Sequence, residues 1–159
     1  MNETTERSQT HHTFVIERTY DVPVATVWDA FAKEESKRGW FGDGGDEYVL
    51  TDFAHDFKVG GRDVNEGRFH GDVVSRYVAT YTDIVEKERI VQSYDMWING
   101  AHISTSVTTI AMEAAGDSTN LTFTEQGVHL DGFDNGSQRE EGTRGILDGL
   151  GAWLAGNKA

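Results

Sequence analysis

The chain contains no cysteine and only one proline, and long apolar runs are absent from it. Without cysteine there is no disulfide framework, no thiolate metal site and no cysteine nucleophile, as is usual for proteins of a reducing compartment. No apolar run approaches the roughly 20 residues that a membrane-spanning helix needs. We therefore expect a soluble, cytoplasmic protein that makes no use of a membrane.

Positive charge is also scarce, since 14 lysines and arginines stand against 27 acidic residues and give a formal net charge of −13. Such a surface repels phosphate backbones and disfavours nucleic acid as a partner. A solvated surface, adaptation to high salt and a patch for a cationic partner would each explain the acidity. Composition alone does not choose among them.

Several motifs that carry chemistry are missing. The glycine-rich segment 42–45 lacks the lysine of a phosphate-binding loop, and no Gly-x-Ser-x-Gly nucleophile motif occurs. The six histidines do not follow the spacing of zinc ligands. We therefore predict no catalytic residue, no metal site and no cofactor from motifs.

The length of 159 residues is about that of one domain. Residues 1–12 are polar and predict a disordered tail, and residues 13–157 predict a single domain. An alternating pattern over Phe14–Tyr20 predicts a strand. Pro23 then suits the first turn of a helix, which a second, shorter helical segment follows. The aromatic pair Trp40-Phe41 after these helices is either a core plug or the mouth of a cavity.

Residues 48–127 show short alternating runs separated by turns, which predict an antiparallel meander. Asn99-Gly100 is the strongest turn, because this dipeptide tolerates the positive φ angles of a type I′ hairpin. A two-residue turn there places Met96 opposite Ile103 and Tyr94 opposite Thr105 on the inner face. It turns Trp97, Asp95 and His102 toward the outer face.

The last strand of the meander places a carboxylate among apolar residues. Leu121, Phe123 and Glu125 alternate on one face of residues 120–126. Burying an unpaired charge costs roughly several kcal/mol, so Glu125 needs an ionic partner or a raised pKa. One interpretation is an ion pair with an inward arginine, for which the candidates are Arg18, Arg62 and Arg76. The other is a ligand anchor or a general base in a cavity.

A long C-terminal helix is predicted over residues 137–154, where Ser137 and Glu140 form the pattern of a capping box. Its apolar residues recur at helical spacing and are Ile146, Leu147, Leu150, Trp153 and Leu154. Four glycines at 142, 145, 149 and 151 either let the helix approach a sheet closely or leave room for a ligand. Strand, short helices, meander and long helix in this order predict an α+β fold.

The chain resembles the START-like, helix-grip superfamily, in particular the group similar to the C-terminal domain of the Aha-type activator of the heat-shock chaperone ATPase. The resemblance covers nearly the whole chain after residue 13. It implies a curved antiparallel sheet wrapped around the C-terminal helix, with short helices after the first strand. The matching stretches are Arg18 to Trp28, Trp40 to Gly42, Asp56 to Arg62, Glu88 to Met96, Phe123 to Gly132 and Arg139 to Leu150.

Members of this superfamily include lipid and hormone binders, polyketide cyclases and chaperone activators, and some take part in stress responses. The first hypothesis is therefore a cavity between sheet and helix that binds a small, mostly apolar or lipid-like molecule. An interaction protein that regulates a chaperone ATPase, or that forms a homodimer through Trp97, is an alternative. A cyclase-type enzyme that uses Glu125 as acid or base is another. The expected cavity residues are Trp40, Phe41, Tyr94, Met96, Ile103, Phe123, Glu125, Leu147 and Leu150.

Overall fold

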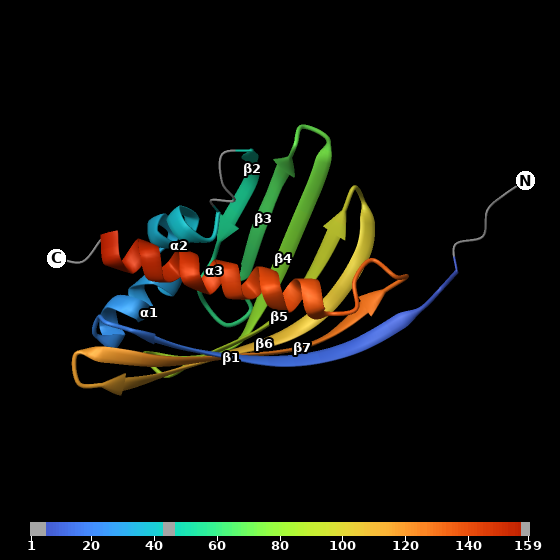
Figure 1. Cartoon of the computed structure of the whole chain (residues 1–159). Coiled ribbons are helices and arrows are strands. Elements are labelled where there is room, and N and C mark those ends of the chain that lie inside the picture. The colour runs from blue at the N-terminus through green and yellow to red at the C-terminus, as the bar shows by residue number, and fades with distance from the viewer. Residues whose placement is uncertain (1–5, 43–46, 157–159) are drawn as a thin grey trace, which may run out of the picture.

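A single antiparallel sheet of seven strands curves around one long helix (Figure 1). The structure, a computed structural model, describes residues 6–42 and 47–156. The strand order is β1-β7-β6-β5-β4-β3-β2, so the first strand pairs with the last one and forms one edge of the sheet. Helix α3 crosses the concave face, and α1 and α2 lie near its C-terminal end. The predicted α+β helix-grip arrangement is confirmed.

The elements follow the predicted order. The two short helices α1 and α2 come directly after the first strand, and the long helix α3 follows the last one. Their bounds are β1 Gln9–Tyr20, α1 Val24–Ala32, α2 Glu34–Trp40, β2 Tyr48–His55, β3 Arg62–Phe69, β4 Val73–Val85, β5 Arg89–Ile98, β6 Ala101–Ala115, β7 Ser118–Leu130 and α3 Ser137–Gly156.

The first strand is longer than the sequence predicted. Residues Gln9 to His12 were expected to belong to a disordered tail, but they pair with residues 127–130 of β7. The prediction was wrong for these four residues because backbone pairing with β7 requires no apolar side chains. Residues 1–5 of the predicted tail and residue 157 of the predicted domain lie outside the described residues.

The Asn99-Gly100 turn forms as predicted, with φ angles of 49° and 82° at its two central residues. The strand register beyond the turn differs from the prediction, because a bulge interrupts the pairing of β5 with β6. Met96 pairs with Ser104 rather than with Ile103, and Tyr94 pairs with Ser106 rather than with Thr105. The bulge inserts one residue and so reverses the faces of β6. Its inner face is therefore hydroxylic, with Ser104, Ser106 and Thr108.

The N-terminus of α3 is capped by Asp134 and not by the predicted capping box. The carboxylate of Asp134 accepts hydrogen bonds from the backbone N–H groups of Gln138 and Arg139, at 3.4 and 3.0 Å. Burial raises the pKa of Asp134, but several backbone N–H donors outweigh this effect and lower it. Ser137 instead bonds Asn135, and the Glu140 side chain bonds His12.

The main core fills the end of the molecule where α1, β1 and the C-terminal half of α3 meet. Tyr20 fixes the helix there, because its hydroxyl donates to the carbonyl oxygen of Leu147 at 2.8 Å. Trp40 fixes α2 to α1 through a 2.8 Å hydrogen bond from Nε1 to the Ala30 carbonyl. The N-terminal half of α3 lies over a sheet region with few apolar core residues, where a cavity remains.

Candidate functional site

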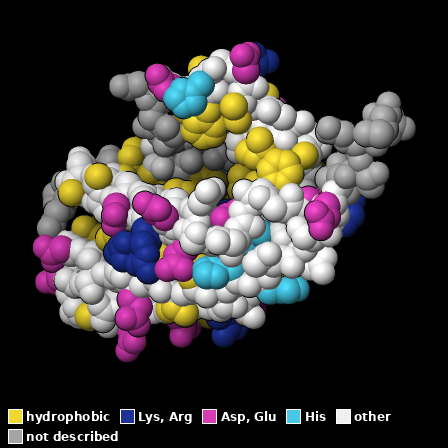
Figure 2. All heavy atoms as spheres, turned by 45° about the vertical axis from the view of Figure 1, so that its right-hand side comes forward, with side chains coloured by type: hydrophobic (Ala, Val, Ile, Leu, Met, Phe, Trp, Pro, Cys, Tyr) yellow, Lys and Arg dark blue, Asp and Glu magenta, His cyan; other side chains and the backbone are white. Residues whose placement is uncertain are grey.

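A cavity of about 440 Å³ lies between residues 139–149 of α3 and the inner face of the sheet. Figure 2 shows a hollow in this side of the molecule with hydrophobic side chains along its rim. Eight aromatic side chains contribute to the wall, and the charged groups are few. The aromatic lining residues are Phe31, Trp40, Phe41, Tyr48, Phe69, Tyr77, Tyr94 and Phe123.

Most of the predicted cavity residues line this space. Those that do are Trp40, Phe41, Tyr94, Met96, Phe123, Glu125 and Leu147. Ile103 and Leu150 are absent from the lining. Ile103 occupies the bulge of β6, so its side chain is displaced from the row that faces α3. Leu150 is fully buried in the main core. Trp40 both lines the cavity and packs in the core, so the two interpretations of the aromatic pair are compatible.

Three glycines of α3 form part of the cavity wall. A Cβ atom added at Gly142, Gly145 or Gly149 would meet nothing within 4 Å. These glycines therefore do not serve close helix-to-sheet packing and instead leave the helix backbone bare beside the cavity. Gly151 differs, because a Cβ atom there would lie 3.3 Å from the Tyr20 ring.

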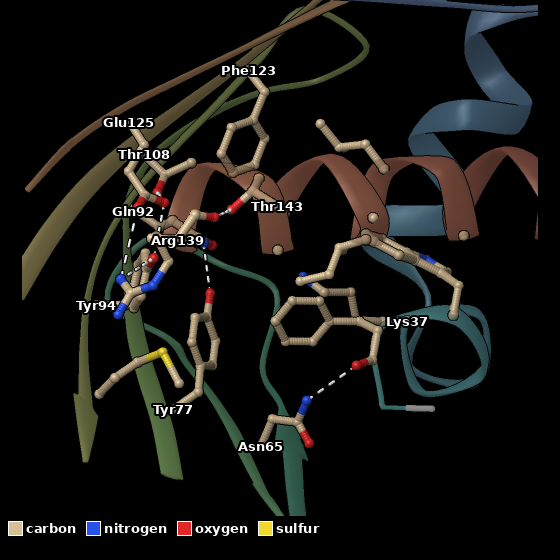
Figure 3. A pocket seen from close by; sticks show the side chains of 18 of the residues that line it. Lys37, Asn65, Tyr77, Gln92, Tyr94, Thr108, Phe123, Glu125, Arg139 and Thr143 are labelled. Carbon is tan, nitrogen blue, oxygen red and sulfur yellow. Dashed lines mark hydrogen bonds and ion pairs between the residues drawn. The ribbon is translucent and has the colours of Figure 1, made fainter. Parts of the chain in front are cut away.

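The polar end of the cavity is built around Glu125, whose side chain is nearly fully buried. Its Oε1 atom accepts hydrogen bonds from the hydroxyl groups of Tyr94, at 2.8 Å, and Thr108, at 3.3 Å. Its Oε2 atom has no hydrogen-bond partner among the described residues. Figure 3 shows this carboxyl group and Tyr94 at the same end of the cavity as Arg139.

Arg139 is the ionic partner of Glu125, which corrects the prediction of Arg18, Arg62 or Arg76. Its Nη1 atom lies 3.8 Å from Oε2 of Glu125 and donates to the hydroxyl of Tyr94 at 2.9 Å. Its Nη2 atom donates to the hydroxyl of Ser104 at 2.8 Å. Arg18 instead pairs with Asp148 on the outer side of α3.

Burial has the largest effect on the pKa values of Glu125 and Tyr94 at the polar end of the cavity. It raises the pKa of Glu125 above its ordinary value, although the hydroxyl of Tyr94 and the charge of Arg139 act in the opposite direction. Burial likewise raises the pKa of Tyr94, and the charge of Glu125 adds to this effect. Tyr94 therefore remains a neutral hydrogen-bond donor at physiological pH.

Arg139 was the main cavity residue that the sequence interpretation missed. Arg139, Thr143 and Leu147 recur four residues apart, so extending the apolar stripe of α3 upstream would have placed the arginine on the cavity side. Lys37 and Tyr77 also line the cavity and were missed. Lys37 belongs to a helix whose sequence is mostly charged, so no pattern distinguished it from its exposed neighbours.

A second buried polar cluster lies beside Lys37. The Nζ atom of Lys37 lies 3.2 Å from Oδ2 of Asp63, which also accepts a hydrogen bond from the hydroxyl of Tyr81. The Oδ1 atom of Asp63 contacts the ring of His55. Burial would raise the pKa of Asp63, but the charge of Lys37 and the hydrogen bonds of His55 and Tyr81 lower it to about 2. The charge of Lys37 is thus balanced outside the cavity lining.

Asp95 and His102 lie on the outer face as predicted, hydrogen-bonded to each other at 2.9 Å with exposed fractions of 41% and 40%. No group of three possible metal ligands occurs among the described residues. Within the same part of the chain, no helix is long and apolar enough to span a membrane.

The sheet, the gripped C-terminal helix and the cavity between them define a START-like, helix-grip domain. The sequence profile described as "Activator of Hsp90 ATPase homolog 1-like protein" matches residues 21–155. The chain therefore belongs to this family. A comparison with curated proteins gave no match.

Solved structures of similar proteins support the same assignment. The Mll3558 protein of Rhizobium loti is 44% identical with a TM-score of 0.85, over 92% of this chain and 99% of that chain. A protein of Rhizobium leguminosarum is 39% identical with a TM-score of 0.86, over 95% of this chain and 99% of that one. An AHSA1-like protein of Aeromonas hydrophila shares the fold at 16% identity, with a TM-score of 0.66 over 91% and 93% of the two chains.

Proposed function

We propose that the protein binds a small, mostly apolar molecule in the cavity between α3 and the sheet. The observation that carries this proposal is the bare helix backbone at Gly142, Gly145 and Gly149, which borders a cavity of about 440 Å³. Glycine in a helix interior costs roughly 0.5–1 kcal/mol relative to alanine. Three such residues on the cavity side are explained if the space beside them is used.

The composition of the wall supports a ligand of this kind. Small-molecule sites are usually apolar cavities of roughly 300–1,000 Å³ with a few well-placed polar groups. This cavity combines an aromatic wall with a polar end at Glu125, Tyr94 and Arg139. The fold and family fit a ligand-binding domain in general, and the wall chemistry supports the narrower proposal.

The test is a fluorescence titration with N-phenyl-1-naphthylamine, a neutral apolar dye that brightens in apolar surroundings. A leucine in the Gly149→Leu variant would extend into the space beside α3. We expect the affinity for the dye to fall about tenfold or more, because the new side chain competes with the dye for volume. The helix should not lose stability, because leucine has a higher helix propensity than glycine.

Ala152→Leu is the matched control, since residue 152 is exposed on the same helix and does not line the cavity. It should bind the dye as the parent does. Absence of dye binding by the parent, or equal binding by the parent and the Gly149→Leu variant, would contradict the proposal.

A second candidate is an enzyme in which Glu125 acts as acid or base. The observation in its favour is the 2.8 Å hydrogen bond from the Tyr94 hydroxyl to a buried carboxyl group whose pKa is raised by burial. A carboxyl group with a raised pKa is suited to donate and accept a proton in general acid–base catalysis. A reaction of a bound ligand whose pH–rate profile is unchanged in the Glu125→Gln variant would rule this candidate out.

A further inference from the structure

The cavity carries the opposite balance of charge from the rest of the molecule. The whole chain has a formal charge of −13. Among the residues that the structure describes, in contrast, the charged residues of the lining are the two cations Lys37 and Arg139 and the acid Glu125. Lys37 is already paired with Asp63 at 3.2 Å. Arg139 is therefore the cation of the lining with the greater capacity to bind a ligand.

The guanidinium of Arg139 is incompletely used within the described chain. Its two hydrogen bonds go to the neutral hydroxyl groups of Tyr94 and Ser104, at 2.9 and 2.8 Å. A guanidinium has five N–H donors in a planar fork that suits a carboxylate. Its acidic neighbour Glu125 lies 3.8 Å away, beyond hydrogen-bond distance. Donors thus remain for an anionic group that enters from the cavity.

The acid beside Arg139 does not exclude an anion. Glu125 is nearly fully buried, and among the described residues only its Oε1 atom receives hydrogen bonds. An incoming negative charge would favour its neutral form, because like charges in one site disfavour ionisation. Besides burial, the main groups that act on the pKa of Glu125 are Tyr94, Arg139, Thr108 and His12, and none of them carries a negative charge at neutral pH.

We propose that the ligand is an anionic amphiphile, with a carboxylate or comparable single negative charge bound by Arg139 and an apolar body along the glycines of α3. This inference rests on the proposed ligand-binding function and narrows its ligand class. Figure 3 shows the arrangement: the Arg139 side chain from α3 lies at one end, while Phe123 lies farther along the helix.

The experiment compares two dyes with one scaffold. N-phenyl-1-naphthylamine is neutral, and 8-anilino-1-naphthalenesulfonate adds a sulfonate to the same rings. We expect the parent to bind the sulfonate about tenfold or more tightly than the neutral dye, since hydrogen bonds to charged groups are strong. Arg139→Gln should remove this preference, so that the variant binds the two dyes with about equal affinity.

Arg144→Gln is the matched control, because Arg144 is an exposed arginine of α3 that pairs with Glu140 outside the cavity. It should keep the preference for the sulfonate. An equal loss in the two arginine variants would show attraction to the helix surface in general and would overturn the inference. So would a parent that binds the two dyes equally, although that result would leave the proposed function standing.

Displacement of the bound sulfonate dye then distinguishes an anionic ligand with an aliphatic body from one with an aromatic body. Displacement by dodecanoate and not by dodecanol supports the inference with an aliphatic body. Displacement by 2-naphthoate and not by 2-naphthol supports it with an aromatic body. Alcohols that compete as well as the acids overturn it. Failure of the parent to bind either dye contradicts the proposed function itself.

Discussion

The Nη1 atom of Arg139 lies 3.8 Å from Oε2 of Glu125, and the hydroxyl of Tyr94 connects the two side chains. Arg139 donates to that hydroxyl, which in turn donates to Oε1 of Glu125. The first turn of α3 is thereby joined to β5 and β7 at one end of the cavity. This chain of contacts makes the polar end of the site sensitive both to the protonation of Glu125 and to the position of α3.

Glu125→Gln should gain stability relative to the parent as pH rises. Burial raises the pKa of the folded Glu125 above its ordinary value of 4.5, so the unfolded chain loses this proton first. The parent therefore loses stability from about pH 4.5 upward, until the folded carboxyl group has ionised. The loss amounts to about 1.4 kcal/mol for each unit by which the pKa is raised.

Urea denaturation of the parent and the Glu125→Gln variant between pH 4 and pH 8 measures this difference. Glu113→Gln, at an exposed position of β6, removes the same formal charge and serves as the control. A difference in unfolding free energy between parent and Glu125→Gln that stays constant over this range would show that burial does not govern Glu125.

Asp134→Ala should destabilise the protein by about 1 kcal/mol or more, because the Asp134 carboxylate accepts from the first backbone N–H groups of α3. Ser137→Ala should change the unfolding free energy much less, since its hydroxyl bonds Asn135 rather than the helix backbone. Thermal or urea denaturation of the two variants compares them directly. The reverse order would mean that the capping box predicted from the sequence is the true cap.

Asp63→Asn should cost about 3–5 kcal/mol of stability, because it removes the anion from a buried pair with Lys37. The folded pKa of about 2 lies below the ordinary value of 3.8, so the contribution of Asp63 is present above pH 3.8 and is lost as pH falls through 2. The deficit of the variant should therefore shrink in acid. Asp83→Asn is the control.

Asp83 forms an exposed ion pair with Arg89 at 2.7 Å. Exposed pairs contribute about 0–1 kcal/mol, so this variant should lose little stability at any pH. A loss as large as that of Asp63→Asn would contradict the distinction between the buried and the exposed pair. Chemical denaturation over a series of pH values provides the measurement for both.

Trp97→Ser tests the alternative that an outer surface binds a chaperone. The Trp97 ring stacks on His102 with the ring centroids 5.3 Å apart, on the face of the sheet opposite to α3. If ligand binding is the function, this variant should bind N-phenyl-1-naphthylamine as the parent does. It should also leave unchanged both the oligomeric state, measured by light scattering, and the rate of a chaperone ATPase. A changed rate or mass would favour the interaction hypothesis.

The sequence predicted the fold well because its strongest local signals agree with one another. Alternation predicted the strands, Asn99-Gly100 fixed the hairpin, and helical spacing placed Leu147 and Leu154 on the buried side of α3. The bulge at Ile103 could not be predicted, because it adds a residue that no turn or pattern marks. The single shift exchanged the inner and outer residues of β6, which is why Thr108 was not expected beside Glu125.

Only part of the candidate site could be predicted, because local patterns mark some of its residues and not others. Glu125 stood out because a carboxylate on an apolar face needs an explanation. Its partner Arg139 did not, because an arginine in the first turn of a helix is ordinarily exposed. Whether the α3 glycines serve close packing or a cavity depends on the distance between helix and sheet. That distance is set by tertiary structure and is not encoded in any local pattern.

Native mass spectrometry of the protein purified gently from its own host shows whether the cavity holds a ligand. We predict a reproducible excess mass that disappears on denaturation and that is absent from the Gly149→Leu variant, because the leucine side chain would extend into open space that borders the cavity. The released compound should be an acid with an apolar body. A bare protein mass, in a parent that also takes up no apolar dye, would contradict the ligand-binding function.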